Sequence, residues 1–409
     1  MSQLLDLLTS LTSCLPCLPS SPTLKINSRS LKILRLLGEG GFSYVYLVQS
    51  LSSPHELYAL KKIRCPFGAE SVSLAMKEVE AYKIFGSTPG IIHSVDYSIA
   101  TERGGGEESK TVYVLLPYYK RGNLQDMINA NLVNHSRFPE KKLMGLFLGV
   151  CRALRGMHVY EGSTEGEGMV VPGQGKRSGN GVNRGADQDD EQEQGRSLLT
   201  EDERVAQARA TGGKRRSYAH RDIKPGNIMI SDSGSDPILM DLGSVAESPL
   251  PITSRSLAIA TQDTAAEHST MPYRAPELFD VKTGTVIDTK VDIWSMGCTL
   301  YACLVGKSPF EMRSDETGGS LSICVLSGDW RFPDEGPGAK KKKNKGKGTG
   351  PGPAEGGAAQ AEEEEGVISE PIREVVRRCL RVEPSERPDI DELIEMVEQV
   401  LEVLPEDEV

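Results

Sequence analysis

The sequence predicts an α+β protein in which strands and a single helix come first and mostly helices follow. Short apolar or alternating runs, which are typical of strands, fill the first 116 residues around one helical segment. From residue 121 onward, apolar residues recur at helical spacing, as in Lys141–His158. Three segments (1–30, 159–216 and 334–366) fit neither pattern, and without them about 290 of the 409 residues remain, enough for a two-lobed enzyme.

The composition disfavours several classes of protein. A formal net charge of −11 argues against binding nucleic acid through a basic surface. The eight cysteines form no His/Cys grouping with zinc spacing, so we expect reduced, intracellular thiols. No run reaches the roughly 18 apolar residues that a membrane span needs, and the N-terminus lacks the positive start of a secretory signal. We therefore expect the protein to face the cytosol.

The N-terminal segment 1–30 is interpreted as a membrane anchor. Leucines at helical spacing precede Cys14 and Cys17, an arrangement typical of S-acylation (palmitoylation). Ser2 stands where N-myristoylation requires glycine, which excludes that modification. Because one acyl chain binds membranes weakly and two give a stable anchor, we expect both cysteines to matter. A disordered tail with two incidental thiols is the alternative.

The first predicted strands, Leu31–Leu37 and Tyr44–Val48, flank a glycine-rich turn whose backbone amides can approach phosphates closely. The next strand, Tyr58–Lys61, ends in a lysine. A helix follows over Ser73–Phe85 and offers two candidate carboxylate partners for that lysine, Glu78 and Glu80.

Two more strands, Ile91–Tyr97 and Thr111–Leu116, lead into the helical half. The helix expected at Lys141–His158 would lead directly along the chain into the stretch that begins at Tyr218. The segment 159–216 interrupts this path with a Gly-rich and charge-rich composition that cannot bury a core, although Thr200–Ala210 opens with a capping-box pattern. The segment 334–366 carries a lysine run and a glutamate run, which indicates a solvated polyampholyte, with a lipid-headgroup patch as the alternative.

Three polar side chains stand out between Tyr218 and Gly243: Asp222, Asn227 and Asp241. Two short apolar runs around a Ser/Asp/Gly turn predict a hairpin that gathers these side chains at one mouth. A few oxygen ligands suit Mg²⁺, which shares its shell with phosphates. A lone Asp or Asn in a loop is usually turn chemistry, but three at these spacings favour a phosphate-handling site.

His220-Arg221-Asp222, with Asn227 five residues beyond Asp222 and then Asp241-Leu242-Gly243, resembles the catalytic loop and metal-binding turn of protein kinases. The stretches GEGGFSYV, YALKKI, LLPYYKRGNL, YAHRDIKPGN, LMDLGS and YRAPELF are similar to the Numb-associated kinase family. Within it they resemble the subgroup of myristoylated and palmitoylated serine/threonine kinases and its fungal vacuolar-membrane counterpart. Ser43 replaces the third loop glycine and Leu242 the usual Phe of the metal-binding turn; we expect the leucine to fill similar apolar space against His220.

The resemblance implies a two-lobed kinase domain over residues 31–404, with an N-lobe sheet carrying one helix (31–116), a hinge (117–120), a mainly helical C-lobe (121–404), disordered inserts at 159–216 and 334–366, and an acidic tail (405–409). ATP and Mg²⁺ are the implied cofactors. The implied catalytic residues are Asp222, Lys224 and Lys61, and the metal ligands are Asn227 and Asp241. The implied ATP contacts are Gly38, Glu39, Gly40, Gly41, Ser43, Val45, Ala59, Lys61, Glu78, Leu116, Pro117 and Tyr119. Family spacing favours Glu78 over Glu80.

The remaining implied residues position the substrate or support the fold: Thr270 faces the catalytic aspartate, Asp292 braces the catalytic loop, and Glu277 pairs with Arg387. The resemblance also implies a helix near Leu257–Ala266. Arg221 offers a partner for an activation-segment phosphate, and the candidate phosphosites are Ser254, Ser256, Thr261, Thr264 and Ser269.

The implied function is transfer of the γ-phosphate of ATP to Ser or Thr hydroxyls of proteins, with autophosphorylation, by a non-specific serine/threonine protein kinase. The resemblance further implies peripheral attachment through acylated cysteines to the cytoplasmic face of Golgi or vacuolar membranes, a cytosolic pool, and a role in membrane trafficking or vacuole dynamics, with no nucleic-acid partner. A pseudokinase scaffold and a lipid or small-molecule kinase are the alternatives; the intact Lys61, Asp222, Asn227 and Asp241 count against the first, and the peptide-binding segment ending at Glu277 against the second.

Overall fold

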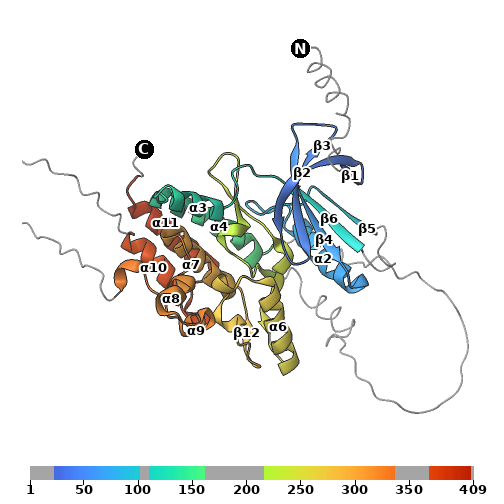
Figure 1. Ribbon diagram of the computed structural model, residues 1–409. Helices are drawn as coiled ribbons and strands as arrows, with labels where there is room; N and C mark the ends of the chain where they lie inside the picture. Colours follow the sequence, from blue (N-terminus) through green and yellow to red (C-terminus); the bar gives the residue numbers. More distant parts are fainter. Residues whose placement is uncertain (1–22, 102–109, 162–215, 337–367, 407–409) are drawn as a thin grey trace, which may run out of the picture. The chain divides into compact units, whose positions relative to one another are not determined.

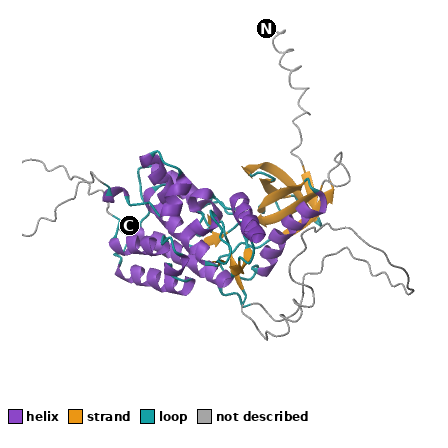
Figure 2. Cartoon of the chain, turned by 90° about the horizontal axis from the view of Figure 1, so that it is seen from below, coloured by secondary structure: helices purple, strands orange, loops and turns teal. Residues whose placement is uncertain are grey.

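The computed structural model describes residues 23–101, 110–161, 216–336 and 368–406 (Figure 1). The described residues from Thr23 to Tyr160 and from Ser217 to Glu406 belong to one compact unit. Within this unit, the six longer strands precede residue 118 and most helices follow it. Figure 2 shows the strands of the large sheet gathered in one region and most helices in another, so the predicted α+β class is confirmed. Cys14, Cys17, Thr200–Ala210 and the charged runs of 340–365 lie outside the described residues.

The N-terminal region is a six-stranded antiparallel sheet in the order β1-β2-β3-β4-β6-β5. Its strands are β1 (Thr23–Ile26), β2 (Arg29–Glu39), β3 (Ser43–Ser50), β4 (Leu57–Cys65), β5 (Asp96–Thr101) and β6 (Lys110–Pro117). The β1–β2 turn is tied to β5, because the Asn27 side chain donates to Asp96 Oδ1 at 2.7 Å and to the Tyr97 carbonyl at 3.1 Å. β1 and the start of β2, which precede the boundary expected at residue 30, are paired in this sheet, and Ile26 is fully buried.

The two faces of this sheet pack into different hydrophobic clusters. One face contributes Ile26, Leu31, Val48, Leu60 and Leu115 to a small cluster of its own. The other face joins the main core, to which β6 contributes residues 112, 114 and 116 together with buried side chains of α2 (Gly68–Ile84). The helix predicted at Ser73–Phe85 is confirmed as α2, which begins five residues earlier.

The strand predicted over Ile91–Tyr97 is wrong for most of its length, since β5 begins only at Asp96. The apolar pair Ile91 and Ile92 is buried, but its backbone bonds to the helical region instead of the sheet. Ile92 donates its N–H to the Leu239 carbonyl at 2.9 Å, and Leu239 donates to the Gly90 carbonyl at 2.8 Å. This apolar run therefore links the two regions of the fold.

The C-terminal region is built mainly of helices around α4 and α7. They are α3 (Leu124–Val133), α4 (Glu140–His158), α6 (Arg255–His268), α7 (Lys290–Val305), α8 (Pro309–Thr317), α9 (Leu321–Ser327), α10 (Glu370–Cys379) and α11 (Ile390–Val403). Short two-stranded pairs lie between them: β7 (Ser217–Ala219) with β10 (Ala246–Ser248), β8 (Ile228–Ile230) with β9 (Pro237–Leu239), and β11 (Leu250–Pro251) with β12 (Val286–Ile287). The predicted hairpin and the helices predicted at Lys141–His158 and Leu257–Ala266 are confirmed as β8–β9, α4 and α6.

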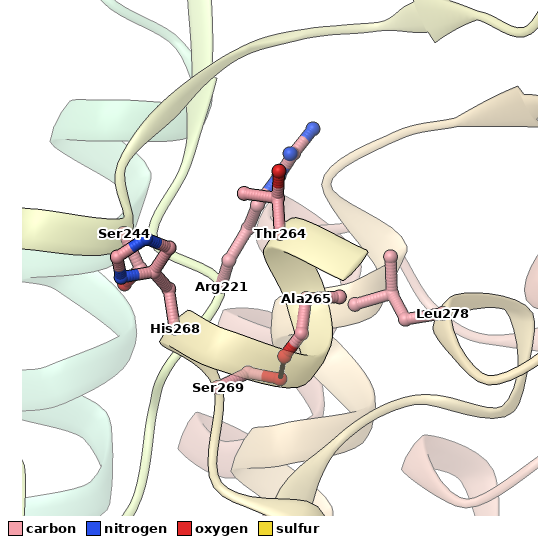
Figure 3. Close-up of a pocket in the computed structure, with 7 residues that line it drawn as sticks. All are labelled: Arg221, Ser244, Thr264, Ala265, His268, Ser269 and Leu278. Carbon is pink, nitrogen blue, oxygen red and sulfur yellow. Dashed lines mark hydrogen bonds between the residues drawn. The ribbon is translucent and has the colours of Figure 1, made fainter. Parts of the chain in front are cut away.

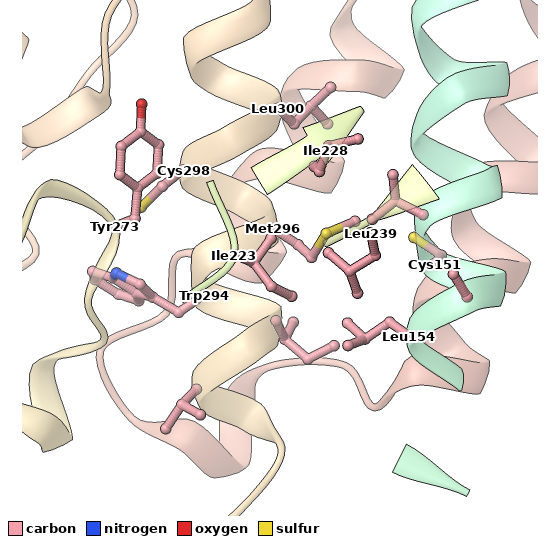
Figure 4. Close-up of a cluster of buried hydrophobic side chains, with 14 of the residues drawn as sticks. Cys151, Leu154, Ile223, Ile228, Leu239, Tyr273, Trp294, Met296, Cys298 and Leu300 are labelled. Carbon is pink, nitrogen blue, oxygen red and sulfur yellow. The ribbon is translucent and has the colours of Figure 1, made fainter. Parts of the chain in front are cut away.

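The core of this region lies directly beneath the segment that carries the polar side chains. Figure 4 shows Ile223 and Ile228 of that segment beside Met296 of α7, with Leu154 of α4 also in the cluster. Each of these four side chains is at most 1% exposed. The apolar side chains of residues 220–242 thus anchor this backbone to the core formed with α4 and α7. The polar side chains of the segment lie on the side away from that core.

Two residues within the segments expected as inserts make contacts with the rest of the fold. Tyr160 packs against Phe85 and Tyr218, and Asp334 accepts two hydrogen bonds from Arg373. In the part of the chain that the structure describes, no helix is long and apolar enough to span a membrane. The six cysteines within it are buried free thiols.

Candidate active site

Lys61 of β4 joins two carboxylates that come from distant parts of the chain. Its Nζ lies 2.7 Å from Glu78 Oε1 on α2 and 2.9 Å from Asp241 Oδ1, which follows β9. Tyr82, one turn after Glu78, donates its hydroxyl to the same Oε1 at 2.8 Å. Of the two glutamates that the sequence offers, it is Glu78 that reaches Lys61.

The charges of this cluster stabilise each other. Burial alone would lower the pKa of Lys61, but Asp241 and Glu78 raise it above its usual value. The charge of Lys61 in turn lowers the pKa of Asp241 to about 2. Lysine and aspartate are therefore both ionised throughout the neutral range, so the cluster presents a fixed cation and a fixed anion.

The turn after Asp241 lies close to α2. Asp241 has a left-handed backbone, with φ at 61°, which aspartate tolerates better than most residues. At Gly243 an added Cβ would stand 3.3 Å from Glu78 Oε2, so a side chain there would press on the lysine's partner. Leu242, between them, is 1% exposed, and the ring Nε2 of His220 donates to the Met240 carbonyl at 3.0 Å. The leucine therefore fills a buried apolar position, as expected.

Strand register places the predicted nucleotide contacts of the sheet on one face. Val45 lies opposite Lys61, Ala59 lies opposite Leu116, and Ala59 and Lys61 are two residues apart on β4. Since side chains alternate along a strand, all four point to the face that carries Lys61. Gly38 pairs with Val45 next to the turn of the β2–β3 hairpin, and a Cβ added at Gly38 or Gly41 would meet no atom within 4 Å. Pro117 ends β6, and Tyr119 follows it half-buried.

Asp222 is buried and held by four side-chain or backbone donors. Its Oδ1 accepts from the backbone N–H and the hydroxyl of Thr270, at 2.9 and 2.7 Å. Its Oδ2 accepts from Lys224 Nζ at 2.8 Å and from Asn227 Nδ2 at 3.0 Å. Lys224 also donates to Thr270 Oγ1 at 2.6 Å. The structure thus brings the four predicted residues into one hydrogen-bonded group.

Asn227 and Asp241 fit a Mg²⁺ ion that is shared with phosphates. Asn227 uses its amide nitrogen toward Asp222, which directs its amide oxygen elsewhere, and Asp241 uses only Oδ1 toward Lys61. The main chain joins the two residues, because Met240 donates its N–H to the Asn227 carbonyl at 2.9 Å. Two protein oxygens leave most of a magnesium shell to water and phosphate, as this ion prefers. The described ranges contain no cluster of three or more His, Cys, Asp or Glu suited to a metal ion.

Asp292, at the start of α7, fixes the backbone of the loop that carries Asp222. Its carboxylate accepts the backbone N–H groups of His220 at 2.7 Å and Arg221 at 2.8 Å. His158, the last residue of α4, adds a third hydrogen bond at 2.9 Å. Burial alone would raise the pKa of Asp292, but these hydrogen bonds and the two nearby histidines lower it below its usual value. Asp292 is fully buried, so the bracing is shielded from water.

The segment after Asp241 is fastened at both ends of α6. Ser254 caps the helix by accepting the Leu257 N–H. At the other end, Arg274 donates to Ser269 Oγ at 2.7 Å and to the Ser269 carbonyl at 3.0 Å. The segment ends at Glu277, whose carboxylate receives two bonds from Arg387, at 2.7 and 2.9 Å. Thr270 is therefore held between two anchored points.

Arg221 faces α6 across a cavity of about 10 Å³, enough for a single water (Figure 3). Its Nε and Nη2 are buried with no hydrogen-bond partner among the described residues, and burial lowers its pKa. Of the five predicted phosphosites, Thr264 and Ser269 line this cavity together with Arg221 (Figure 3). Ser254 is engaged as a helix cap and Thr261 is buried.

Sequence reasoning missed two residues that organise the site. His158 contacts Asp292 from the end of α4, and Arg274 closes the end of α6. Arg274 stands inside a motif that the sequence does highlight, three residues before Glu277. His158 had no such signal, because its partner lies 134 residues away.

Comparison with known proteins gives a consistent result. The protein kinase domain family matches residues 215–397. The chain is 33% identical to serine/threonine-protein kinase ENV7 of Saccharomyces cerevisiae, over 92% of this chain and 94% of that protein. It is 34% identical to serine/threonine-protein kinase ppk13 of Schizosaccharomyces pombe, over 91% of each. Human serine/threonine-protein kinase 16 is 32% identical over 74% of this chain and 78% of its own length.

Proposed function

The chain belongs to the protein kinase family and is a serine/threonine protein kinase, and on that premise we propose which of its residues transfer the phosphoryl group and where in the cell it acts. The observation that carries the proposal is the pair of hydrogen-bonded groups around Lys61 and Asp222. The first joins strand, helix and metal-binding turn, and the second joins the catalytic loop to the substrate side.

Asp222 is the base. It accepts the proton of the acceptor hydroxyl as that oxygen bonds to the γ-phosphorus of ATP and the bond from this phosphorus to the β,γ-bridging oxygen breaks, leaving ADP. Lys224, 2.8 Å from Asp222, lies where it can neutralise the transferring phosphoryl group. Thr270, whose hydroxyl donates to Asp222 at 2.7 Å, helps to orient the carboxylate that the acceptor hydroxyl must approach.

Lys61 binds the α- and β-phosphates, and Glu78 fixes the direction of its ammonium group. The glycine-rich turn, from Gly38 to Ser43, covers the phosphates with backbone N–H groups, while Val45, Ala59, Leu116, Pro117 and Tyr119 receive the base and ribose. Asn227 and Asp241 would hold Mg²⁺ beside the phosphates. When bound, the ion offsets the negative charge that the phosphates concentrate. Both ligands offer only oxygen atoms, the donor type that Mg²⁺ prefers.

The test is incorporation of γ-phosphate into a generic basic protein and into the chain itself. Asp222→Asn keeps the size of the side chain and its acceptor to Lys224 but cannot take a proton, so we expect a loss of about 10³-fold in kcat. Asp236→Asn, an exposed carboxylate on the β8–β9 turn, is the matched control and should be fully active. Equal activity of the two variants would refute the assignment of Asp222.

The kinase domain is proposed to run from Thr23 to Leu404, since β1 is part of the sheet and α11 ends at Val403. Residues 162–215 and 337–367 are insertions into it, and 405–409 are its acidic tail. This revises the limits expected from the sequence at both inserts and at the N-terminus.

Membrane attachment is proposed to use Cys14 and Cys17 as acylated residues, with the chain on the cytoplasmic face of a Golgi or vacuolar membrane and partly in the cytosol. The anchor segment joins the sheet at Thr23, only six residues after Cys17, which would hold the N-terminal lobe near the lipid surface. The double variant Cys14→Ser with Cys17→Ser should lose acyl labelling and leave the membrane fraction. Each single variant should bind weakly, since one chain anchors poorly. Unchanged fractionation of the double variant would exclude this anchor.

A further inference from the structure

Three aromatic rings meet where residues 162–215 leave and rejoin the described chain. Tyr160 is two residues beyond the end of α4, and Tyr218 lies in β7, four residues before Asp222. Their ring centroids are 5.7 Å apart in an edge-to-face arrangement. The long excursion between α4 and the catalytic loop therefore begins and ends at one point.

The third ring comes from the helix that carries Glu78. Phe85, the C-cap residue of α2, makes edge-to-face contacts with Tyr160 at 5.5 Å and with Tyr218 at 5.3 Å. It is fully buried. Tyr160 also donates its hydroxyl to the carbonyl of Ile84 at 3.4 Å, in the last turn of α2, where helix carbonyls lack internal partners. The cluster thus fixes the end of α2 seven residues beyond Glu78.

Each end of the excursion is also held by the rest of the fold. His158 hydrogen-bonds Asp292, and β7 pairs with β10, with Tyr218 opposite Glu247. Keeping the ends of any long intervening segment at one point has an entropic cost that grows with its length. The contacts of the three-ring cluster offset part of this cost. Without them, the tendency of the two ends to separate would loosen α2 and the catalytic loop.

We propose that Phe85, Tyr160 and Tyr218 form a clasp that positions α2, and through it the Lys61–Glu78 pair, independently of residues 162–215. Tyr160 is its key positioning residue, because it belongs to the incoming end and contacts α2 through both its ring and its hydroxyl. The clasp explains how a segment of this length is accommodated immediately before the catalytic loop. The inference rests on the phosphate-binding role proposed above for Lys61 and Glu78.

The test compares the full chain with a shortened chain in which a six-residue Gly/Ser linker replaces residues 162–215. We expect the shortened chain to keep kcat and the KM for ATP within about twofold of the full chain. In the full chain, Tyr160→Ala should raise the KM for ATP by about tenfold, because α2 loses the contacts that fix it. In the shortened chain the same substitution should raise it only about twofold, since the short linker itself holds the ends together.

Conservative variants separate a specific clasp from general damage to the fold. Tyr160→Phe keeps both ring contacts and loses only the 3.4 Å hydrogen bond, so it should stay within about twofold of the unmodified chain. Tyr160→Leu keeps apolar volume and provides a folded comparison if Tyr160→Ala unfolds. Tyr97→Ala is the matched control: its ring contacts Lys83 on the same helix, 4.6 Å from the ammonium, but far from the insertion point in sequence, and should leave the KM for ATP unchanged.

Three results would overturn the inference. An inactive but folded shortened chain would mean that residues 162–215 act directly on the catalytic loop. Equal effects of Tyr160→Ala in the full and shortened chains would give the ring a structural role unrelated to the excursion. No effect on the KM for ATP in either chain would remove the link to Lys61. An inactive unmodified chain, in contrast, would refute the proposed active site and not the clasp, whose contribution thermal unfolding of the same variants would still report.

Discussion

The ion pair between Glu277 and Arg387 yields the sharpest prediction for stability. Arg387 is buried, its side chain fully so, and beyond Glu277 it donates to the carbonyls of Arg381, Val382 and Lys290 at 2.7 to 2.9 Å. Its guanidinium also lies 5.0 Å from the ring of Trp294. Arg387→Ala removes all of these contacts and leaves a carboxylate that is only 15% exposed without a partner.

Removing one partner of a buried pair costs about 3–5 kcal/mol, because the other charge loses its compensation. That is a large part of the roughly 5–15 kcal/mol that stabilises an ordinary domain, and for a domain of this size it corresponds to a fall in melting temperature of roughly 10 °C. Thermal and urea unfolding of the purified chain measure it. Arg378→Ala, an exposed arginine on α10, is the matched control and should change stability by less than about 0.5 kcal/mol.

A second substitution separates the charge from the lost packing. Adding Glu277→Gln to Arg387→Ala removes the uncompensated carboxylate, so the double variant should be more stable than Arg387→Ala alone by about 1–2 kcal/mol. Glu277→Gln in the unmodified chain should instead destabilise, since Arg387 then lacks its anion. If the two substitutions simply add, the reasoning from buried charge is refuted and packing alone accounts for the loss.

Three further predictions concern the active site. Glu78→Gln should raise the KM for ATP by about tenfold, whereas Glu80→Gln should leave it unchanged, and equal effects in steady-state assays would contradict the pairing with Lys61. Asp292→Asn offers one acceptor oxygen where the carboxylate offers two, so we expect unfolding to become easier by about 1–3 kcal/mol, and kcat to fall with it. The pKa of Asp241 near 2 lies below its usual value, so the pair with Lys61 stabilises the fold fully above about pH 4 and loses this effect as the pH falls toward 2. The stability difference between the unmodified chain and Lys61→Met should accordingly be constant from about pH 5 to 9 and shrink below about pH 4, and a change within the neutral range would count against it.

The chemistry of the site follows from the sequence because its central groups are close along the chain. Asp222, Asn227 and Asp241 lie within twenty residues of one another, and the hairpin that joins them has its own local signals in apolar runs and turn residues. The order of strands and helices is likewise a matter of local periodicity, which is why α4, α6 and β8–β9 appear where expected. The strand predicted at Ile91 was wrong because an apolar pair indicates only that the residues are buried, and not which segment they pair with. A strand in the sheet and a bridge to β9 would both bury Ile91.

What the tertiary structure alone decided is which distant groups meet. Side chains two positions apart on a helix are rotated by about 200° around its axis, so only one of Glu78 and Glu80 can face Lys61. The packing of α2 on the sheet determines which one does. The bond of His158 to Asp292 spans 134 residues and that of Arg387 to Glu277 spans 110, distances over which no spacing rule acts. The sequence by itself determined the kinds of groups and their local order. Their mutual positions, including the rings of Tyr160 and Tyr218 that close the base of the long excursion, depend on side chains packing together in three dimensions.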